Sequence, residues 1–266
     1  MKIEQAINIF FSPTGTTKKI VTAISTSLNI KNNNEINLTN EYSDLNIINI
    51  PSTSIAIIGI PVYRGGLPFE AVKRLNQISG KKTPAIINVI YGNRDYDNAL
   101  IELKQIISRQ GFVPIAEGAF IGEHSFSSRE YPIAANRPDK KDLESALTFG
   151  QMISKKINSQ DWTTPELSKQ DYIDIKKKEP LRVSPIVDIN LCDNCGRCKM
   201  SCPTGSIINS LGKITTKQET CITCMACVKT CHNNARSIQD QKLLNIIKML
   251  HDNNQKRKEP AFKLLI

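Results

Sequence analysis

The chain has 266 residues, 40% of them hydrophobic and 23% charged, and a formal net charge of +10. This length allows one or two domains with a hydrophobic core, and no apolar run approaches the about 18 residues that a membrane-spanning helix needs. Because the N-terminus, Met1-Lys2-Ile3, also lacks a signal sequence, we expect a soluble, cytoplasmic protein without a membrane span.

A hydroxyl-rich turn follows the first candidate strand. The apolar run at residues 6–11 stops at residues 12–17, Ser-Pro-Thr-Gly-Thr-Thr, and the helical spacing of Ile20, Ile24 and Leu28 begins behind it. Such a turn places backbone N–H groups and hydroxyls at the positive end of a helix, where a phosphate can bind. It is neither a Walker A loop nor a dinucleotide glycine fingerprint. The alternative is an ordinary N-cap turn whose hydroxyls only satisfy the helix.

Strands and helices then alternate as far as residue 157. A weak candidate strand covers residues 34–38, and near-continuous apolar runs predict strands buried on both faces at residues 53–60, 84–91 and 112–120. Helical spacing predicts helices at residues 68–79, 95–110 and 138–157. The alternation predicts an α/β fold with a doubly wound parallel sheet. Ligands of such sheets bind beyond the carboxyl ends of the strands.

Three segments at those strand ends contain both glycine and an aromatic residue. They are residues 61–68 (Pro-Val-Tyr-Arg-Gly-Gly-Leu-Pro), 91–96 (Tyr-Gly-Asn-Arg-Asp-Tyr) and 122–126 (Gly-Glu-His-Ser-Phe). Glycine permits close backbone approach, and an aromatic ring can stack on a flat ligand. We expect these segments and the hydroxyl-rich turn to form one crevice. The alternatives are buried loop tyrosines, a structural loop histidine and plain surface arginines.

All eight cysteines lie between Cys192 and Cys231, in two runs of spacing C-x2-C-x2-C-x3-C. The second run repeats the first 29 residues later. This spacing lets three thiolates on a short loop meet three corners of one iron–sulfur cube, with a helix beginning at the fourth cysteine. A disulfide framework and a zinc ribbon are the alternatives. Disulfides need an oxidising compartment, and zinc sites use cysteines in two separate pairs.

The cysteine runs closely resemble those of bacterial two-cluster ferredoxins, in which the fourth cysteine of each run ligates the other cluster. By that resemblance, one [4Fe-4S] cluster takes Cys192, Cys195, Cys198 and Cys231, and the second takes Cys221, Cys224, Cys227 and Cys202. His232 stands where proline is usual in this family. We interpret it as a hydrogen-bonding loop residue rather than a ligand, because four thiolates per cluster are already present.

The turn at residues 12–17 resembles the phosphate loop of flavodoxins, Ser/Thr-x-Thr-Gly-x-Thr, and the whole chain resembles the flavodoxin-ferredoxin fusion proteins of anaerobes. The resemblance implies FMN with its phosphate on Ser12, Thr14, Gly15, Thr16 and Thr17. It implies an isoalloxazine ring flanked by Pro61, Val62, Tyr63, Arg64, Gly65, Gly66, Tyr91, Gly92, Asn93, Arg94 and Asp95, with His124 near the ring. Tyr63 and Tyr91 are the candidates for stacking.

The same resemblance divides the chain into four parts. Residues 1–160 would form a flavodoxin-like FMN-binding domain with sheet order 2-1-3-4-5. Residues 161–185, which contain three prolines and no periodicity, would be a linker. Residues 186–238 would form a small α+β two-[4Fe-4S] ferredoxin domain. Residues 239–266 would be a C-terminal helix and tail, and we expect the helix to pack back on the protein.

The net charge invites a nucleic-acid hypothesis, which cofactor binding weakens. Two oxidised cubane clusters carry about −2 each and a flavin phosphate about −2, so the loaded protein would carry about +4. A docking surface for an acidic redox partner, or a solvated face, explains the lysines better.

The two cofactor types together predict an electron-transfer protein that exchanges low-potential electrons with a partner redox protein. Whether the chain is an enzyme stays open. The alternatives are an FMN-dependent reductase of its own small substrate, fed through the clusters, and a scaffold that the clusters merely staple. The chain has no second nucleotide fingerprint, so direct oxidation of NAD(P)H is not supported.

Overall fold

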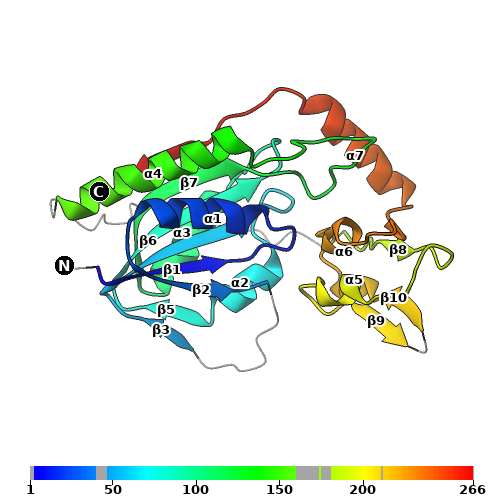
Figure 1. The fold of residues 1–266 in the computed structure, drawn as a ribbon, viewed down its shortest axis with the longest axis horizontal. Coiled ribbons are helices and arrows are strands. Elements are labelled where there is room, and N and C mark those ends of the chain that lie inside the picture. The colour runs from blue at the N-terminus through cyan, green and yellow to red at the C-terminus, as the bar shows by residue number, and fades with distance from the viewer. Residues whose placement is uncertain (1–2, 40–46, 160–173, 175–180, 211, 266) are drawn as a thin grey trace.

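The computed structural model describes residues 3–39, 47–159, 174, 181–210 and 212–265. Most of the predicted linker at residues 161–185 lies outside these ranges. A larger region is built around a sheet and a smaller one from short helices and strand pairs, and the two lie end to end (Figure 1). None of the described helices combines the length and the apolar character that crossing a membrane requires.

The larger region is built on five parallel strands in the order β2-β1-β4-β6-β7. In chain order this is 2-1-3-4-5, so the predicted sheet order is confirmed. The two central strands β4 and β6 are buried along their whole length, which explains their near-continuous apolar sequences. The bounds of the five strands are Gln5–Phe10 (β1), Asn32–Asn37 (β2), Ser54–Pro61 (β4), Thr83–Tyr91 (β6) and Phe112–Ile121 (β7).

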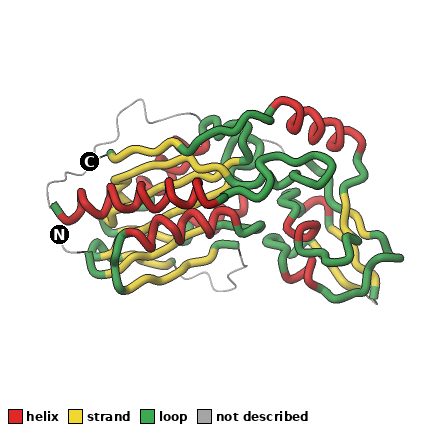
Figure 2. Tube along the Cα trace, turned by 45° about the horizontal axis from the view of Figure 1, so that its top comes forward, coloured by secondary structure: helices red, strands yellow, loops and turns green. Residues whose placement is uncertain are grey.

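Helices cover both faces of the sheet. One face packs against α1 (Thr16–Ser27) and α4 (Lys140–Asn158), which lie side by side over the strands in Figure 2. The other face packs against α2 (Phe69–Leu75) and α3 (Ala99–Arg109). The loops that lead from each parallel strand to the next helix lie at the carboxyl edge of the sheet. The smaller region lies at this edge (Figure 1).

Two local elements differ from the sequence prediction. The helix predicted at residues 68–79 ends at Leu75, because Ile78 is buried and begins strand β5 (Ile78–Gly80). This strand pairs in parallel with β3 (Ile48–Ile50), and together they form a separate two-stranded sheet. Helix α3 begins at Ala99 rather than at Asp95, because the Asp95 carboxylate accepts hydrogen bonds from the backbone N–H groups of Tyr96 and Asp97 and holds a turn there.

The C-terminal segment returns to the sheet. Helix α7 (Gln241–Asn253) leads away from the smaller region, and β12 (Ala261–Leu264) pairs antiparallel with β7 as the sixth strand (Figure 1). The Phe262 ring stacks on Phe120 and also contacts Phe149. The sequence analysis assigned no role to this tail. The alternation of Phe262 and Leu264 toward the core was the signal for a strand.

The smaller region consists of two short antiparallel strand pairs and short helices. Ile207 and Ile214 pack with Cys198 and Cys227 in a core of their own, as expected of a small α+β domain. The bounds are Ile186–Val187 (β8), Arg197–Met200 (α5), Ile207–Ser210 (β9), Lys213–Thr216 (β10), Gln218–Thr220 (η2), Ala226–Lys229 (α6) and Arg236–Ser237 (β11), with β8 paired to β11 and β9 to β10.

Candidate functional site

The two cysteine runs follow the same backbone path. In each run the residues before and after the second cysteine adopt a left-handed conformation, with φ between 53° and 74°. They are Asn194 and Gly196 in the first run and Thr223 and Met225 in the second. This conformation is strained for a β-branched residue such as Thr223 and costs about 1–3 kcal/mol. Since the same backbone conformation recurs at equivalent positions, it indicates one shared constraint, which a cluster held in each loop would supply.

The third cysteine of each run lies within a short helix. Cys198 belongs to α5 and Cys227 to α6, whereas the fourth cysteines, Cys202 and Cys231, follow the helix ends. The expectation that a helix begins at the fourth cysteine is therefore wrong, because the left-handed residue just after the second cysteine starts the helix one turn earlier.

One cavity of the smaller region is lined by cysteines from both runs. Four thiols border it, those of Cys202, Cys221, Cys224 and Cys227, together with the side chains of Ile207 and Met225. This is the ligand set that the resemblance implies for the second cluster. The donor set of four thiols in an otherwise apolar cavity fits an iron–sulfur cube.

Burial controls the protonation of these thiols. It raises the pKa of Cys224 well above the usual range and that of Cys227 to about 11, although Arg236 partly offsets the rise at Cys227. Without iron the two thiols are protonated at neutral pH. Binding iron therefore releases protons and couples cluster assembly to folding of this region.

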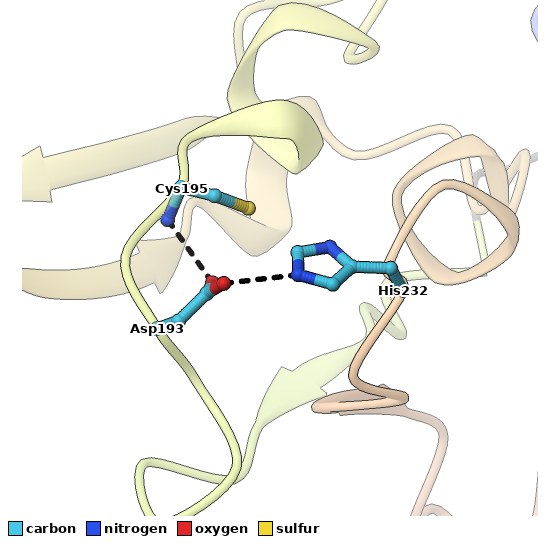
Figure 3. Close-up of side chains that lie close together, drawn as sticks. All are labelled: Asp193, Cys195 and His232. Carbon is cyan, nitrogen blue, oxygen red and sulfur yellow. Dashed lines mark hydrogen bonds and ion pairs between the residues drawn. The ribbon is translucent and has the colours of Figure 1, made fainter.

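The remaining four cysteines range from buried to exposed: Cys198 is buried, Cys192 and Cys231 are half-buried. Cys195 is exposed, and the histidine that departs from the family pattern lies beside it, as Figure 3 shows. The Asp193 carboxylate accepts a hydrogen bond from the Cys195 backbone N–H at 3.2 Å and contacts His232 Nε2 at 2.9 Å. These two bonds, the backbone bond first, lower the pKa of Asp193. His232 thus has the hydrogen-bonding role that the sequence analysis favoured.

The hydroxyl-rich turn ends directly at the start of α1. Gly15 occupies the N-cap position with φ of 83° and its residue type offers no capping side chain, so the N–H groups of Thr16 and Thr17 at the start of α1 have no side-chain acceptor among the described residues. Ser12 Oγ accepts from the Lys18 N–H at 3.0 Å. Thr17 Oγ1 is buried without a hydrogen-bond partner among the described residues. An uncapped helix start and an unpartnered buried hydroxyl fit a bound phosphate.

A cleft of ≈ 210 Å³ opens at this turn. One wall is formed by the turn and the end of β2, and the other by Met200, Ser201, Cys202 and Pro203 of the smaller region. The residues that line the first wall are Phe10, Ser12, Pro13, Gly15, Lys18, Asn37 and Thr39. The sequence analysis missed Lys18, Asn37 and Thr39, because the weak β2 pattern concealed which loop follows that strand.

Direct contacts fix the smaller region against this edge of the sheet. Arg74 of α2 is buried and donates to the carbonyls of Leu38 and Thr39, both at 2.7 Å, and to that of Pro203. Lys229 forms an ion pair with Glu123, in the loop after β7. Ile222 packs on the core of the larger region. Neither Arg74 nor Ile222 carried a signal in the sequence that could have identified it.

The segment at residues 61–66 forms a tight turn that faces the cysteines. Tyr63 and Gly66 exchange two backbone hydrogen bonds, and both Arg64 and Gly65 have positive φ, which describes a two-residue hairpin turn. Burial and, after it, the nearby Cys224 thiol raise the pKa of Tyr63, while a hydrogen bond with Ser125 lowers it. This tyrosine, which belongs to one of the predicted flavin loops, therefore lies near a predicted cluster ligand.

The segment at residues 91–95 is held from outside by the C-terminal segment. Asn93 is buried; its side chain donates to the carbonyls of Asn254 and Lys256 and accepts from the Lys258 N–H. Tyr91 is buried in the core, with its ring 5.4 Å from that of Tyr96. Arg94 forms an ion pair with Asp97 and its carbonyl accepts from the Lys258 ammonium.

His124 lies on the neighbouring segment. A Cβ atom at Gly92 would stand 2.3 Å from the His124 ring, so glycine is required there. His124 Nδ1 accepts a hydrogen bond from the Phe126 N–H at 3.0 Å. Burial, and then the charges of Lys229 and Arg94, lower the pKa of His124 to about 4, which makes it neutral at pH 7.

The structure brings some predicted residues together and separates others. Ser12 and Gly15 line the cleft, and Thr17 lies buried at the helix start beneath it. The residues predicted to flank the ring, those of segments 61–66 and 91–95, do not line the cleft. The residues present fit the phosphate end of FMN, and the two cysteine loops fit iron–sulfur clusters.

Comparison with known proteins bears on the two regions separately. The profile of the 4Fe-4S dicluster domain family matches residues 184–232. An uncharacterized ferredoxin of Methanocaldococcus jannaschii is 37% identical over 71 residues, which are 26% of this chain and 48% of that protein. The chain thus spans about half the length of the curated relative that it matches.

Solved structures align with the larger region at low identity. A flavodoxin from the domain Archaea is 15% identical, with a TM-score of 0.38, over 58% of this chain and 99% of its own. The flavodoxin of Streptococcus pneumoniae TIGR4 is 17% identical, with a TM-score of 0.40, over 57% and 99%. The rubredoxin oxygen:oxidoreductase of Desulfovibrio gigas is 13% identical, with a TM-score of 0.43, over 60% and 37%. The flavodoxin-like assignment rests instead on the strand order.

Proposed function

We propose that this chain, in which a flavodoxin-like sheet is joined to a 4Fe-4S dicluster domain, is an electron-transfer iron–sulfur flavoprotein. It would hold two [4Fe-4S] clusters on its eight cysteines and one FMN at the phosphate turn, and pass electrons between them within one chain. The observation that carries the proposal is the shared cleft, in which the phosphate turn stands on one wall and Cys202 on the other.

The chain's residues would divide the work of binding. Ser12, Thr17 and the start of α1 would hold the phosphate, which the unpartnered hydroxyl of Thr17 and the place of Ser12 in the wall of the cleft support. Segments 61–66 and 91–95 would approach the ring, and Tyr63 would separate it from Cys224. When bound, each cluster exchanges one electron and FMN one or two, so the chain can combine single electrons into a pair.

The first cysteine run is the proposed docking side for the redox partner. Cys195 is exposed, whereas Cys224 and Cys227 of the second run are both 8% exposed. Electrons from a partner would therefore enter or leave at Cys192, Cys195, Cys198 and Cys231, and the second cluster would face the flavin. The partner is a redox protein, donor or acceptor, and an acidic surface on it would complement the positive net charge.

Rapid reduction of anaerobically purified protein tests the proposal. We expect about eight irons and one FMN per chain, and flavin bleaching that follows cluster reduction at a rate independent of protein concentration. Arg74→Met should slow this step, because it removes the contact to Pro203, whereas Lys73→Met, an exposed neighbour on α2, should not. A rate proportional to protein concentration would show transfer between chains. Absence of FMN would refute the proposal.

A substrate-specific reductase is distinguished by the same preparation. Protein reduced with dithionite is offered small-molecule acceptors without any partner protein. Reoxidation only by another redox protein fits the carrier. Steady turnover of one small molecule fits the reductase, but the arginine that would bind an anionic substrate, Arg94, is already paired with Asp97.

A further inference from the structure

A buried arginine lies between the two cysteine runs. Arg236 in β11 is 3% exposed and pairs through its backbone with Val187 of β8. Its Nη2 group donates to the Pro185 carbonyl at 3.0 Å and to Thr216 Oγ1 at 2.6 Å, and it lies 3.7 Å from the Cys227 sulfur. These contacts orient the guanidinium group toward the cysteines.

The rest of the guanidinium group has no partner. Nε and Nη1 are buried and make no hydrogen bond with any described residue. No described carboxylate forms an ion pair with Arg236. A buried cation without a counter-charge destabilises a fold strongly, and each unpaired buried donor adds to that cost. No group among the described residues supplies the negative charge that would offset this guanidinium group, and a bound anionic cofactor would supply it.

One proposed sulfur ligand contacts this charge directly, because the Cys227 sulfur lies 3.7 Å from Arg236 Nη2. Each thiol becomes a thiolate once iron binds, and each oxidised cluster then carries about −2. The missing counter-charge is thus present when the clusters are.

We infer that Arg236 is a positioning residue for the iron–sulfur chemistry: its fixed charge beside Cys227 and its unpartnered Nε–H and Nη1–H groups would stabilise the reduced, more negative clusters. The inference rests on the two-cluster part of the proposed function. Hydrogen bonds to sulfur and nearby charge raise the potential of iron–sulfur clusters. Because the contact is to Cys227, the second cluster should respond more than the first.

Potential titrations followed by electron paramagnetic resonance test this role. Arg236→Met should lower both potentials, with the reduced-to-oxidised ratio of the second cluster falling at least about tenfold at a fixed potential, which is about 59 mV for one electron. Arg236→Lys, which keeps the charge, should give potentials between those of the wild type and those of Arg236→Met. Arg197→Met removes an exposed arginine that precedes Cys198 in the sequence and should change the ratio little. Unchanged potentials in Arg236→Met protein with full iron would overturn the inference.

A second measurement needs no variant of Arg236, in case Arg236→Met fails to assemble its clusters. Wild-type protein labelled with [guanidino-15N]arginine is reduced and studied by electron spin-echo spectroscopy. A nitrogen coupling that persists in Arg197→Met protein supports the inference, and its absence contradicts it. If wild-type protein holds no iron at all, the proposed function fails instead, so the two failures are distinguishable.

Discussion

The iron–sulfur region and the flavin region place cofactor-binding groups in opposite ways. All eight thiols come from one stretch of sequence, Cys192 to Cys231, whose two loops repeat the same left-handed residues. The proposed flavin site would draw instead on loops that begin at Ser12, Pro61, Tyr91 and Gly122, and residues 200–203 of the smaller region line the cleft at the first of these loops. A site whose ligands are close together in the sequence can be recognised from their spacing. A site whose residues come from several distant loops forms only when the chain folds, so spacing does not reveal it.

The largest expected effect tests whether each cluster is held by one cysteine run or by cysteines of both runs. Crossed ligation predicts that Cys202→Ala with Cys224→Ala removes one cluster only, because both thiols border the same cavity. Iron should fall from about eight to about four per chain. Cys202→Ala with Cys195→Ala should remove nearly all iron. If each cluster were held by one run alone, Cys202→Ala with Cys195→Ala would remove one cluster and Cys202→Ala with Cys224→Ala would remove both. Iron analysis of the two double variants decides between these two arrangements. Ser201→Ala, beside Cys202, is the control.

The same contrast explains how much the sequence revealed. The strand positions followed from apolar runs such as residues 53–60, because burial on both faces leaves a pattern in the sequence, whereas the strand order came from the resemblance to flavodoxins. Ser12 and Thr17 were predicted because a helix start concentrates donors locally. The partners of Asn93 could not be predicted, since its contacts come from residues 254–258, more than 150 positions later. Arg74 and Arg236 were missed for the same reason, as burial of a charge depends on tertiary contacts.

The next effect is on the phosphate end of the flavin site. Thr17→Val keeps the shape of the side chain but removes the unpartnered hydroxyl. A hydrogen bond to a charged group contributes about 1.5–3 kcal/mol, so FMN should bind roughly 10- to 150-fold more weakly. Riboflavin, which lacks the phosphate, should bind unchanged. Thr26→Val, on the exposed side of the same helix, is the control. Flavin fluorescence titrations give both affinities, and equal weakening for riboflavin would place the hydroxyl away from the phosphate.

The smallest expected effect is a pH dependence of stability that arises from His124, in the loop after β7 whose Glu123 pairs with Lys229 of the smaller region. Burial lowers the pKa of His124 from its usual value near 6.5 to about 4, so between these values the unfolded chain binds a proton that the folded chain does not. The free energy of unfolding therefore falls as the pH falls from about 6.5 to about 4, by at most about 3 kcal/mol.

His124→Asn should remove most of this pH dependence, because the Asn oxygen can still accept from the Phe126 N–H but has no proton to gain. Urea unfolding under anaerobic conditions at about pH 7.5 and about pH 5 measures it, with the clusters intact. His251→Gln on α7 is the matched control and should keep the wild-type slope. A wild-type slope in His124→Asn protein would mean that this ring is hydrated, and that the loops between sheet and clusters are more open than their contacts indicate.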